Sequence, residues 1–497
     1  MIFLKIAIIG MGISGASTLK SLIDSGAVSE HDHVDIFEPR KEIGTGFAYQ
    51  EDEDTLLMNS YSTRLSLNED NPDEYIEWLR HYYPEYSEDD FSPRHIFGLY
   101  LRDKFETYIS TSYVNHIQER VIDLEIQQFN PKNPRDYQYI IKTEQNTYSN
   151  YEYVFMTIGH PPYADYYDLI KSEHYIHNPY PLSETLKKID KQDRVGIIGS
   201  SLTAIDITHA LMDKCELQAP VNLYSRYQPF TNVKNKLYTN TIHLTMDESW
   251  IEEEKNRYQG AIPLEVMWEK LKDDLQQNGV NILEAIDKYQ IGSVSAMRRQ
   301  TQETPLDLQI IQRYVGLLTA YLPSLNMALT PADRQAFHTK YKRLFEHFRT
   351  QFPAIKMNLM HQWLENGHIR FITGLKDIKV TDQQTFIIET REGYQHTVDK
   401  LINATGFQMN LDQAAKIDPL IATLYHREII TQHSLGGIQI SWPGSHPLSL
   451  KYGEIHTMVL SGAWIFTTQF GNNNAQMTAR HGKFMAENFL KYRKTLS

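Results

Sequence analysis

A glycine pattern near the start of the chain has the spacing of a dinucleotide-binding turn. The segment GMGISG at 10–15 is G-x-G-x-x-G, and it lies between an apolar run at 3–9 and the helical pattern ASTLKSLIDSG. The first glycine permits a tight turn, the second lets a pyrophosphate approach the backbone, and the third lets helix and strand pack closely. The N-terminus of the helix favours an anion. The residues expected to hold a diphosphate are Gly10, Gly12, Ile13, Ser14 and Gly15.

A carboxylate follows the glycines at the sequence spacing that is typical of a ribose-binding residue. The apolar run at 33–37 predicts a second strand, and Glu38 ends it 23 residues after Gly15. An acidic residue about 20 positions beyond the glycines accepts hydrogen bonds from ribose hydroxyls. The alternative is a glycine-rich turn with an incidental surface glutamate.

Two later segments are expected to be strands of the same domain. The segment at 153–159 ends in Thr157-Ile-Gly159, and the segment at 400–407 contains Ala404-Thr405-Gly406. Small residues at the carboxyl ends of parallel strands permit a dinucleotide to lie close to the sheet edge. Taken alone, each segment could also be a plain strand and turn.

A second nucleotide-binding turn is predicted after the strand at 194–198. Gly199 opens it, Ser200 and Ser201 can donate hydrogen bonds, and a helix follows towards residue 212. The next strand, at 221–224, leads to Arg226, whose guanidinium suits a 2′-phosphate and so favours NADPH over NADH. An ordinary strand–helix–strand unit without a ligand is the alternative. The residues expected to bind the nicotinamide cofactor are Gly199, Ser200, Ser201, Leu202, Thr203 and Arg226.

Composition excludes several classes of protein. The 497 residues carry 49 basic and 62 acidic side chains, so the net charge of -13 argues against binding to nucleic acid or to an anionic membrane. The single cysteine excludes an intrachain disulfide and a redox-active cysteine pair. No apolar run is long enough for a membrane span, and a cytoplasmic location is expected. The histidines show no spacing typical of a metal site, and no serine-nucleophile motif is present.

Several segments of the sequence resemble those of a known protein family. These segments are GMGISGAS at 10–17, FEPRKEIGTGFAY at 37–49, LLMNSYSTRLSL at 56–67, IIGSSLTAID at 197–206 and INATGF at 402–407. The chain resembles the bacterial FAD–NAD(P)-binding flavoproteins, which are related to flavin-dependent N-oxygenases. The resemblance implies that Glu38, Pro39 and Arg40 contact the adenosine half of FAD. It places Gly46, Phe47, Ala48 and Asn59 on the flavin side, and it closes the cofactor pocket with Thr157, Gly159, Ala404, Thr405, Gly406 and Phe407.

These observations predict an α/β protein with two Rossmann-like domains. The expected FAD-binding domain spans 1–165 and 366–497, the NAD(P)-binding domain spans 166–238, and a mostly helical insertion spans 239–365. Apolar residues at helical spacing indicate the insertion, which would cap the active site or build a substrate pocket; amphipathic packing is the plainer interpretation. A final helix near Ala475 is expected after a turn at 471–474. In similar flavoproteins such a helix N-terminus faces the flavin, and plain docking on the sheet is the alternative.

The function expected from this organisation is that of an FAD-dependent oxidoreductase that uses NADPH or NADH. A monooxygenase that uses O2 to oxygenate a small amine or amino-acid-like substrate is the sharpest form. A reductase that passes electrons to a quinone or a protein partner, and a redox sensor with little turnover, are the alternatives. No catalytic side chain is singled out, and no metal is expected.

Overall fold

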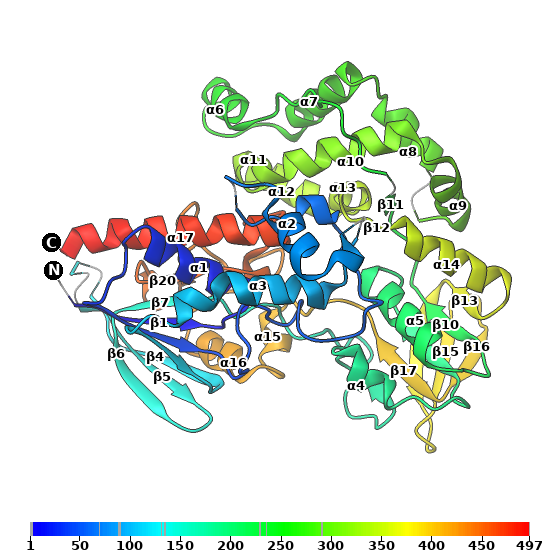
Figure 1. Cartoon of the computed structure of the whole chain (residues 1–497), viewed down its shortest axis with the longest axis horizontal. Helices are drawn as coiled ribbons and strands as arrows, with labels where there is room; N and C mark the ends of the chain where they lie inside the picture. Colours follow the sequence, from blue (N-terminus) through cyan, green and yellow to red (C-terminus); the bar gives the residue numbers. More distant parts are fainter. Residues whose placement is uncertain are drawn as a thin grey trace. The chain divides into compact units, whose positions relative to one another are not determined.

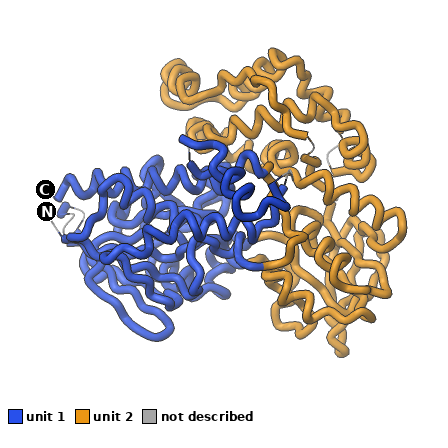
Figure 2. The backbone as a smooth tube through the Cα atoms, viewed as in Figure 1, with its two compact units in different colours: residues 1–51, 62–162, 407–497 blue, residues 52–61, 163–406 orange. Residues whose placement is uncertain are grey.

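A computed structural model divides the chain into two compact units, each described here by itself. The described residues are 3–68, 70–87, 91–130, 132–133, 136–227, 230–234, 236–289 and 292–496. Unit 1 comprises 1–51, 62–162 and 407–497, and unit 2 comprises 52–61 and 163–406 (Figure 2). No described helix has the length and apolar character that crossing a membrane requires.

Unit 1 is built on a five-stranded parallel sheet in the order β20-β7-β1-β2-β3. The central strand β1 has the sequence KIAII, of which all but the first residue is buried, as expected for a strand covered on both faces. The two strands predicted first by the sequence lie side by side as β1 and β2. The bounds are β1 Lys5–Ile9, β2 His33–Phe37, β3 Val114–Ile117, β7 Tyr153–Met156 and β20 Met458–Leu460.

Helices and smaller sheets complete unit 1. The last helix, α17, packs against α1, and Gly482 makes the close approach possible, because a Cβ there would lie 2.8 Å from the Ser17 carbonyl carbon (Figure 1). Helix α17 begins at Ala475, as predicted. The remaining bounds are α1 Ile13–Asp24, α2 Glu74–Tyr82, α3 Arg94–Ile109, β4 Val121–Gln128, β5 Gln138–Thr143, β6 Thr147–Tyr151, α15 Leu411–Ala414, α16 Pro419–His426, β18 Leu448–Ser449, β19 Gly453–Glu454 and α17 Ala475–Leu496.

Unit 2 contains a second parallel sheet in the order β13-β10-β9-β17-β8. This order corrects the expected domain boundary. Strand β17 pairs with β9, so the strand that ends at Asn403 belongs to the second sheet and not to the first. An apolar strand followed by Ala-Thr-Gly fits either sheet, and the sequence alone could not assign it. The bounds are β8 Tyr175–Ile176, α4 Leu182–Leu186, β9 Val195–Ile198, α5 Leu202–Lys214, β10 Val221–Tyr224, β13 Ile369–Ile372 and β17 Lys400–Asn403, with an antiparallel sheet of β14 Leu375–Val380, β15 Phe386–Thr390 and β16 Gln395–Val398.

The helical insertion lies between β10 and β13 of the second sheet. The Thr330 side chain caps α12 by accepting a hydrogen bond from the Asp333 backbone N–H, and Pro331 is the first helical residue. A π-helical segment, η5 (Phe337–Tyr341), joins α12 to α13. The bounds are β11 Val233–Lys234, α6 Glu248–Arg257, α7 Leu264–Gln277, α8 Ile282–Tyr289, α9 Val294–Glu303, α10 Leu306–Leu318, α11 Leu322–Ala328, α12 Pro331–Ala336, α13 Lys342–Arg349, β12 Phe352–Pro353 and α14 Ala354–Glu365.

Candidate functional sites: two dinucleotide turns

The glycine turn of unit 1 has no room for side chains at its three glycines. Gly10 has a φ of +92°, and a Cβ there would lie 2.4 Å from the Thr157 carbonyl oxygen. A Cβ on Gly15 would lie 2.2 Å from the Gly10 carbonyl oxygen. At Gly12 the Cβ would lie 3.1 Å from the Gly46 Cα, so these two glycines face each other. Helix α1 begins beside this gap with no side-chain cap and no acidic residue in its first turn. Its first N–H groups are therefore available to an anion.

Glu38 lies against the same turn. This buried carboxylate accepts a hydrogen bond from the Met11 N–H at 3.0 Å, and its other oxygen accepts from the Arg40 Nε at 2.9 Å. The end of β2 is thereby tied to the glycine turn, at the position from which a ribose hydroxyl would be bound. Pro39 follows on the surface. The arrangement suits the role predicted for Glu38 and Arg40, which stays a prediction.

The small residues after β7 support the turn. The Thr157 hydroxyl donates to the Gly10 carbonyl oxygen at 2.6 Å, so this side chain holds the glycine turn in place. Gly159, with a φ of +77°, lies near Gly462, where a Cβ would come within 3.1 Å of the Gly159 carbonyl oxygen. The carboxyl ends of β1, β7 and β20 thus meet at one edge with small residues on each.

Aromatic rings line the approach to this edge within unit 1. The His160 ring stacks on Phe407 with 4.8 Å between centroids, and the Phe47 ring centroid lies 6.0 Å from that of His160. Phe47 follows Gly46, and Ala48 after it is exposed. The structure therefore brings together Gly46, Phe47 and Phe407, which the sequence placed in the cofactor pocket, and adds His160 to them.

A buried chain of hydrogen bonds reaches the glycine turn from the C-terminal helix. The Ser14 hydroxyl donates to the Ser461 hydroxyl at 2.7 Å, and Ser461 lies 2.9 Å from Nδ1 of His481. The other ring nitrogen of His481 lies 3.0 Å from the Ser445 hydroxyl, which also accepts from Gln469 at 3.0 Å. Burial lowers the pKa of His481 to about 4, so the ring is neutral near pH 7. A neutral imidazole has one donor and one acceptor nitrogen, so a change of tautomer can reverse the hydrogen bonds between Ser445 and Ser14, whereas the Gln469 amide always donates to Ser445.

The second turn, in unit 2, has a single glycine with the same geometry. Gly199 has a φ of +132°, and a Cβ there would lie 2.3 Å from the Ala404 carbonyl oxygen. Ser201 is the N-cap of α5, but its side chain makes no capping bond, so the first N–H groups of α5 are open to an anion. Ser200 precedes it, and Leu202 and Thr203 form the first turn of the helix.

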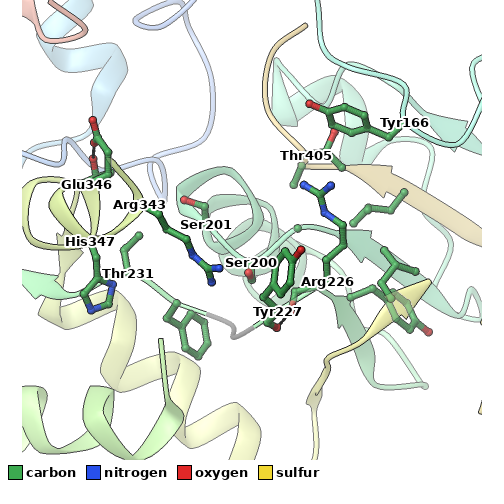
Figure 3. Close-up of a pocket in the computed structure, with 18 of the residues that line it drawn as sticks. Tyr166, Ser200, Ser201, Arg226, Tyr227, Thr231, Arg343, Glu346, His347 and Thr405 are labelled. Atoms are coloured by element: carbon green, nitrogen blue, oxygen red, sulfur yellow. Dashed lines mark hydrogen bonds between the residues drawn. The ribbon is translucent and has the colours of Figure 1, made fainter. Parts of the chain in front are cut away.

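A cavity of about 570 Å³ opens beside this turn, entirely within unit 2. Gly199, Ser200, Ser201 and Arg226 line it, and their binding of the nicotinamide cofactor stays a prediction. Other lining residues are Tyr166, Tyr227, Thr231, Arg343, His347, Ala404 and Thr405 (Figure 3). Ala404 and Thr405 had been expected beside FAD. The structure places them on the second cavity, because the strand that they follow is part of the second sheet.

Two arginines of this cavity come from parts of the chain far apart in sequence. Figure 3 shows the Arg343 side chain reaching from the helical insertion towards Tyr227, with Arg226 beyond that ring. The Arg343 guanidinium carbon lies 5.0 Å from the Tyr227 ring centroid, and that of Arg391 lies 5.3 Å from the same centroid. Arg226 lies 5.5 Å from the Tyr166 ring centroid. An adjoining cavity of about 630 Å³ is lined by Arg226, Tyr227, Arg343 and Lys340. Cations and aromatic faces in this arrangement suit a phosphate together with an adenine ring.

The sequence missed Arg343 and Lys340 because they lie on the helical insertion. The pattern ADRQAFHTKYKRLFEHFRTQF predicts helix and allows both a substrate pocket and plain amphipathic packing, but it singles out neither residue. Its basic residues were the available signal, but the π-helical segment that carries Lys340 and leads to Arg343 has no sequence signature. Such segments often occur at functional sites.

Two predicted residues lie in unit 2 rather than in unit 1. Asn59 belongs to the short segment 52–61, and its backbone carbonyl accepts a hydrogen bond from the Lys234 ammonium at 2.6 Å. The proximity of its side chain to a flavin stays a prediction. Gly406, with a φ of +92°, accepts a hydrogen bond from the Ala164 N–H at 2.9 Å and ends unit 2.

Comparison with known proteins gives one family match. Residues 7–161 match the model of a family described as FAD-NAD(P)-binding. This segment contains the last three residues of β1, the glycine turn, Glu38 and β7. No curated protein matches the chain.

Solved structures share the fold over nearly the whole chain. L-lysine 6-monooxygenase from Pseudomonas syringae has a TM-score of 0.59 at 12% identity, covering 99% of both chains. Ornithine N-hydroxylase from Kutzneria sp. 744, with reduced FAD, NADP+ and L-ornithine, has a TM-score of 0.55 at 14% identity, again over 99% of both. A bacillithiol disulfide reductase from Staphylococcus aureus has a TM-score of 0.50 at 12% identity over 99% of both. At these identities the likeness establishes the fold, and the chemistry must be argued from the sites.

Proposed function

We propose that this chain, whose residues 7–161 belong to the FAD-NAD(P)-binding family, is an FAD- and NADPH-dependent monooxygenase of a small amine or amino-acid-like substrate. The observation that carries the proposal is the presence of two separate dinucleotide turns, each with an uncapped helix N-terminus, of which the second opens on a cavity lined by Arg226 and Arg343. FAD reduced by NADPH supplies the electrons with which O2 is activated and one oxygen atom is transferred to the substrate.

The first turn suits FAD. The gap between Gly12 and Gly46 is a cradle that a Cβ would fill, and the open N–H groups of α1 would hold the diphosphate there. The Ser14 hydroxyl would turn to donate to a diphosphate oxygen and would then accept from Ser461 instead of donating to it, because the neutral His481 can take the tautomer that this reversed direction requires. Glu38 would bind the ribose of the adenosine half.

The second turn suits NADPH. Gly199 and the N-terminus of α5 would hold the diphosphate, and the cavity beside them has the volume of a ligand pocket. Arg226 and Arg343 would share the 2′-phosphate, which NADH lacks. Arginine is suited to this contact because its planar guanidinium binds phosphate oxygens in pairs.

The proposal of an amine substrate rests on the similarity of the fold to those of solved structures. The similar structures include an L-lysine 6-monooxygenase and an ornithine N-hydroxylase, each aligned along almost its full length. The same fold also serves a disulfide reductase, but a mechanism that uses a redox-active cysteine pair is excluded on this chain, because Cys215 is the only cysteine. Oxygen transfer to an amine is therefore the chemistry that we favour.

Product analysis under isotopically labelled O2 tests the proposal. The purified flavoprotein is supplied with NADPH and, in turn, with ornithine, lysine and short diamines, and the products are examined by mass spectrometry. We expect one amine to gain a single labelled oxygen atom, with NADPH and O2 consumed in equal amounts. NADPH oxidation that is supported by a quinone, with no labelled product from any amine, would instead identify a reductase. Bound flavin that neither NADPH nor NADH reduces would identify a redox sensor.

A further inference from the structure

Three side chains that can bind a metal ion converge in unit 1, at the hairpin before β20. They are His446, Glu454 and His456, and one ligand atom from each lies within 4.8 Å of the others. His446 precedes β18, Glu454 ends β19, and His456 lies between that strand and β20. The hairpin brings together residues whose sequence spacing matches no metal-binding motif.

His446 is held in the tautomer that a metal ligand needs. Its Nδ1 lies 2.9 Å from the Met458 carbonyl oxygen, a contact that requires Nδ1 to carry the proton and donate it. The lone pair of the ring is then on Nε2. A backbone carbonyl that fixes the other nitrogen of a histidine in this way is typical of metal sites, where it orients the ring and strengthens the ligand.

The His446 ring takes the place that a side chain at residue 444 would occupy. A Cβ on Gly444 would lie 2.6 Å from Cδ2 of His446 and 3.0 Å from its Nε2. Gly444 is absent from the glycines with positive φ, so the backbone does not require glycine here. Glycine at position 444 therefore makes room for the His446 ring and is not required by the backbone conformation of the turn.

The other two ligands can close on the same point. The side chains of His456 and Glu454 are 57% and 37% exposed, and Nδ1 of His456 lies 3.6 Å from the Glu454 carboxylate. The two histidine rings lie 5.3 Å apart, edge to face. Zinc binds nitrogen and oxygen at about 2.0–2.2 Å, so its ligand atoms must come closer by roughly an ångström, which exposed side chains can do by rotation.

From this geometry we propose that His446, Glu454 and His456 bind one Zn2+ ion, which fastens the β18–β19 hairpin of the FAD-binding unit. Two imidazoles and one carboxylate suit a borderline-soft divalent ion, and water would complete the coordination. Each strand of this hairpin has only two residues, so the ion would add a cross-link where the sheet provides few hydrogen bonds. None of its three ligands belongs to the residues of either dinucleotide turn, and the inference does not rest on the proposed reaction.

Titration of the metal-free flavoprotein, without an affinity tag, tests the site. After chelator treatment and dialysis, ZnCl2 is added in a calorimeter, and CoCl2 is added in a parallel absorbance experiment. We expect one equivalent of Zn2+ to bind and to raise the thermal midpoint. H456A and E454Q, which change exposed side chains, should each weaken binding at least about tenfold. H31A, at an exposed histidine in the same unit, is the matched control and should leave binding unchanged.

G444A gives a second test in which all three ligands remain. The added methyl group should force the His446 ring to move and so weaken Zn2+ binding. If G444A does not fold, the result with H456A still tests the proposal. The proposal is overturned if no equivalent of Zn2+ binds. It is also overturned if H456A and E454Q bind as tightly as H31A, because the ion would then be held elsewhere.

Discussion

The two dinucleotide turns of this chain follow one backbone plan with opposite charges at the end of the second strand. In unit 1, β2 ends at Glu38, which is tied to the glycine turn by the Met11 N–H. In unit 2, β10 is followed by Arg226, and the helical insertion adds Arg343 to the same cavity. A carboxylate selects free ribose hydroxyls, whereas a guanidinium selects a ribose phosphate. The comparison suggests that the turn provides binding to any dinucleotide and the strand end decides which one is bound.

The first turn depends on three glycines, so a bulky residue there should have the largest effect. Gly12→Val would place a branched side chain against Gly46, in the cradle proposed for the diphosphate. We expect FAD binding to weaken about 100-fold or more, through overpacking of roughly 3 kcal/mol. The ratio of flavin to protein absorbance after purification measures this. Gly316→Val is the control, because a Cβ there meets no atom within 4 Å. If Gly12→Val is purified with a full content of flavin, the first turn is not the FAD site, and the comparison of the two turns no longer holds.

The second turn should lose its preference for NADPH over NADH when the charge at position 226 is reversed. Arg226→Glu gives this site the carboxylate found in the first, and we expect kcat/KM for NADPH to fall about 30-fold while that for NADH changes little. Arg343→Ala should lower kcat/KM for NADPH about tenfold, since one arginine remains. The measurement is the rate of flavin reduction with each cofactor. Arg298→Glu alters a 46% exposed arginine of the insertion and should change neither rate. An equal loss for NADPH and NADH would show that the arginines do not read the 2′-phosphate.

The sequence predicted the parts of both sites that depend on local backbone geometry. The strand–glycine–helix order at 5–24 and at 195–214 lies where expected, because glycine positions and apolar runs determine such turns locally. The sheet to which 400–403 belongs could not be predicted, since pairing with β9 is a long-range choice between two similar sheets. Arg343 was missed for the same reason. Helical spacing indicates that a side chain lies on one face of a helix, but it does not say which cavity that face meets.

The histidine of the hydrogen-bond chain should make the stability of the protein depend on pH. Burial lowers the pKa of His481 to about 4, below the ordinary value of 6.5. Between these two values the unfolded chain binds a proton that the folded protein does not, so stability falls as pH falls from 6.5 towards 4. At pH 5 the loss is about 2 kcal/mol relative to pH 7. His481→Asn should be less stable at pH 7 but should lose less on acidification.

Denaturant unfolding of both proteins at pH 7 and pH 5 measures this difference. The exposed His31 provides the control, since His31→Asn should keep the full dependence on pH. Buried histidines of unit 2 should add to the acid sensitivity of the unmodified protein, because burial also lowers the pKa of His209, on α5, to about 3 and that of His347 to about 4. Parallel losses in His481→Asn and the unmodified protein would show that other groups cause the acid sensitivity.

The smallest effect is expected at Ser461, whose hydroxyl joins the chain of hydrogen bonds to the first turn. Ser461→Ala removes the partner of Ser14, which is 2.7 Å away, and leaves the glycines and α1 unchanged. The loss of one hydrogen bond between neutral groups is worth about 1 kcal/mol, so FAD should bind about fivefold more weakly. Fluorescence titration of the FAD-free protein is sensitive enough to resolve this. Ser25→Ala, at the far end of α1, should bind FAD normally. If Ser461→Ala also binds FAD normally, Ser14 contributes to the site without support from the C-terminal helix, and the two turns are more alike than their surroundings suggest.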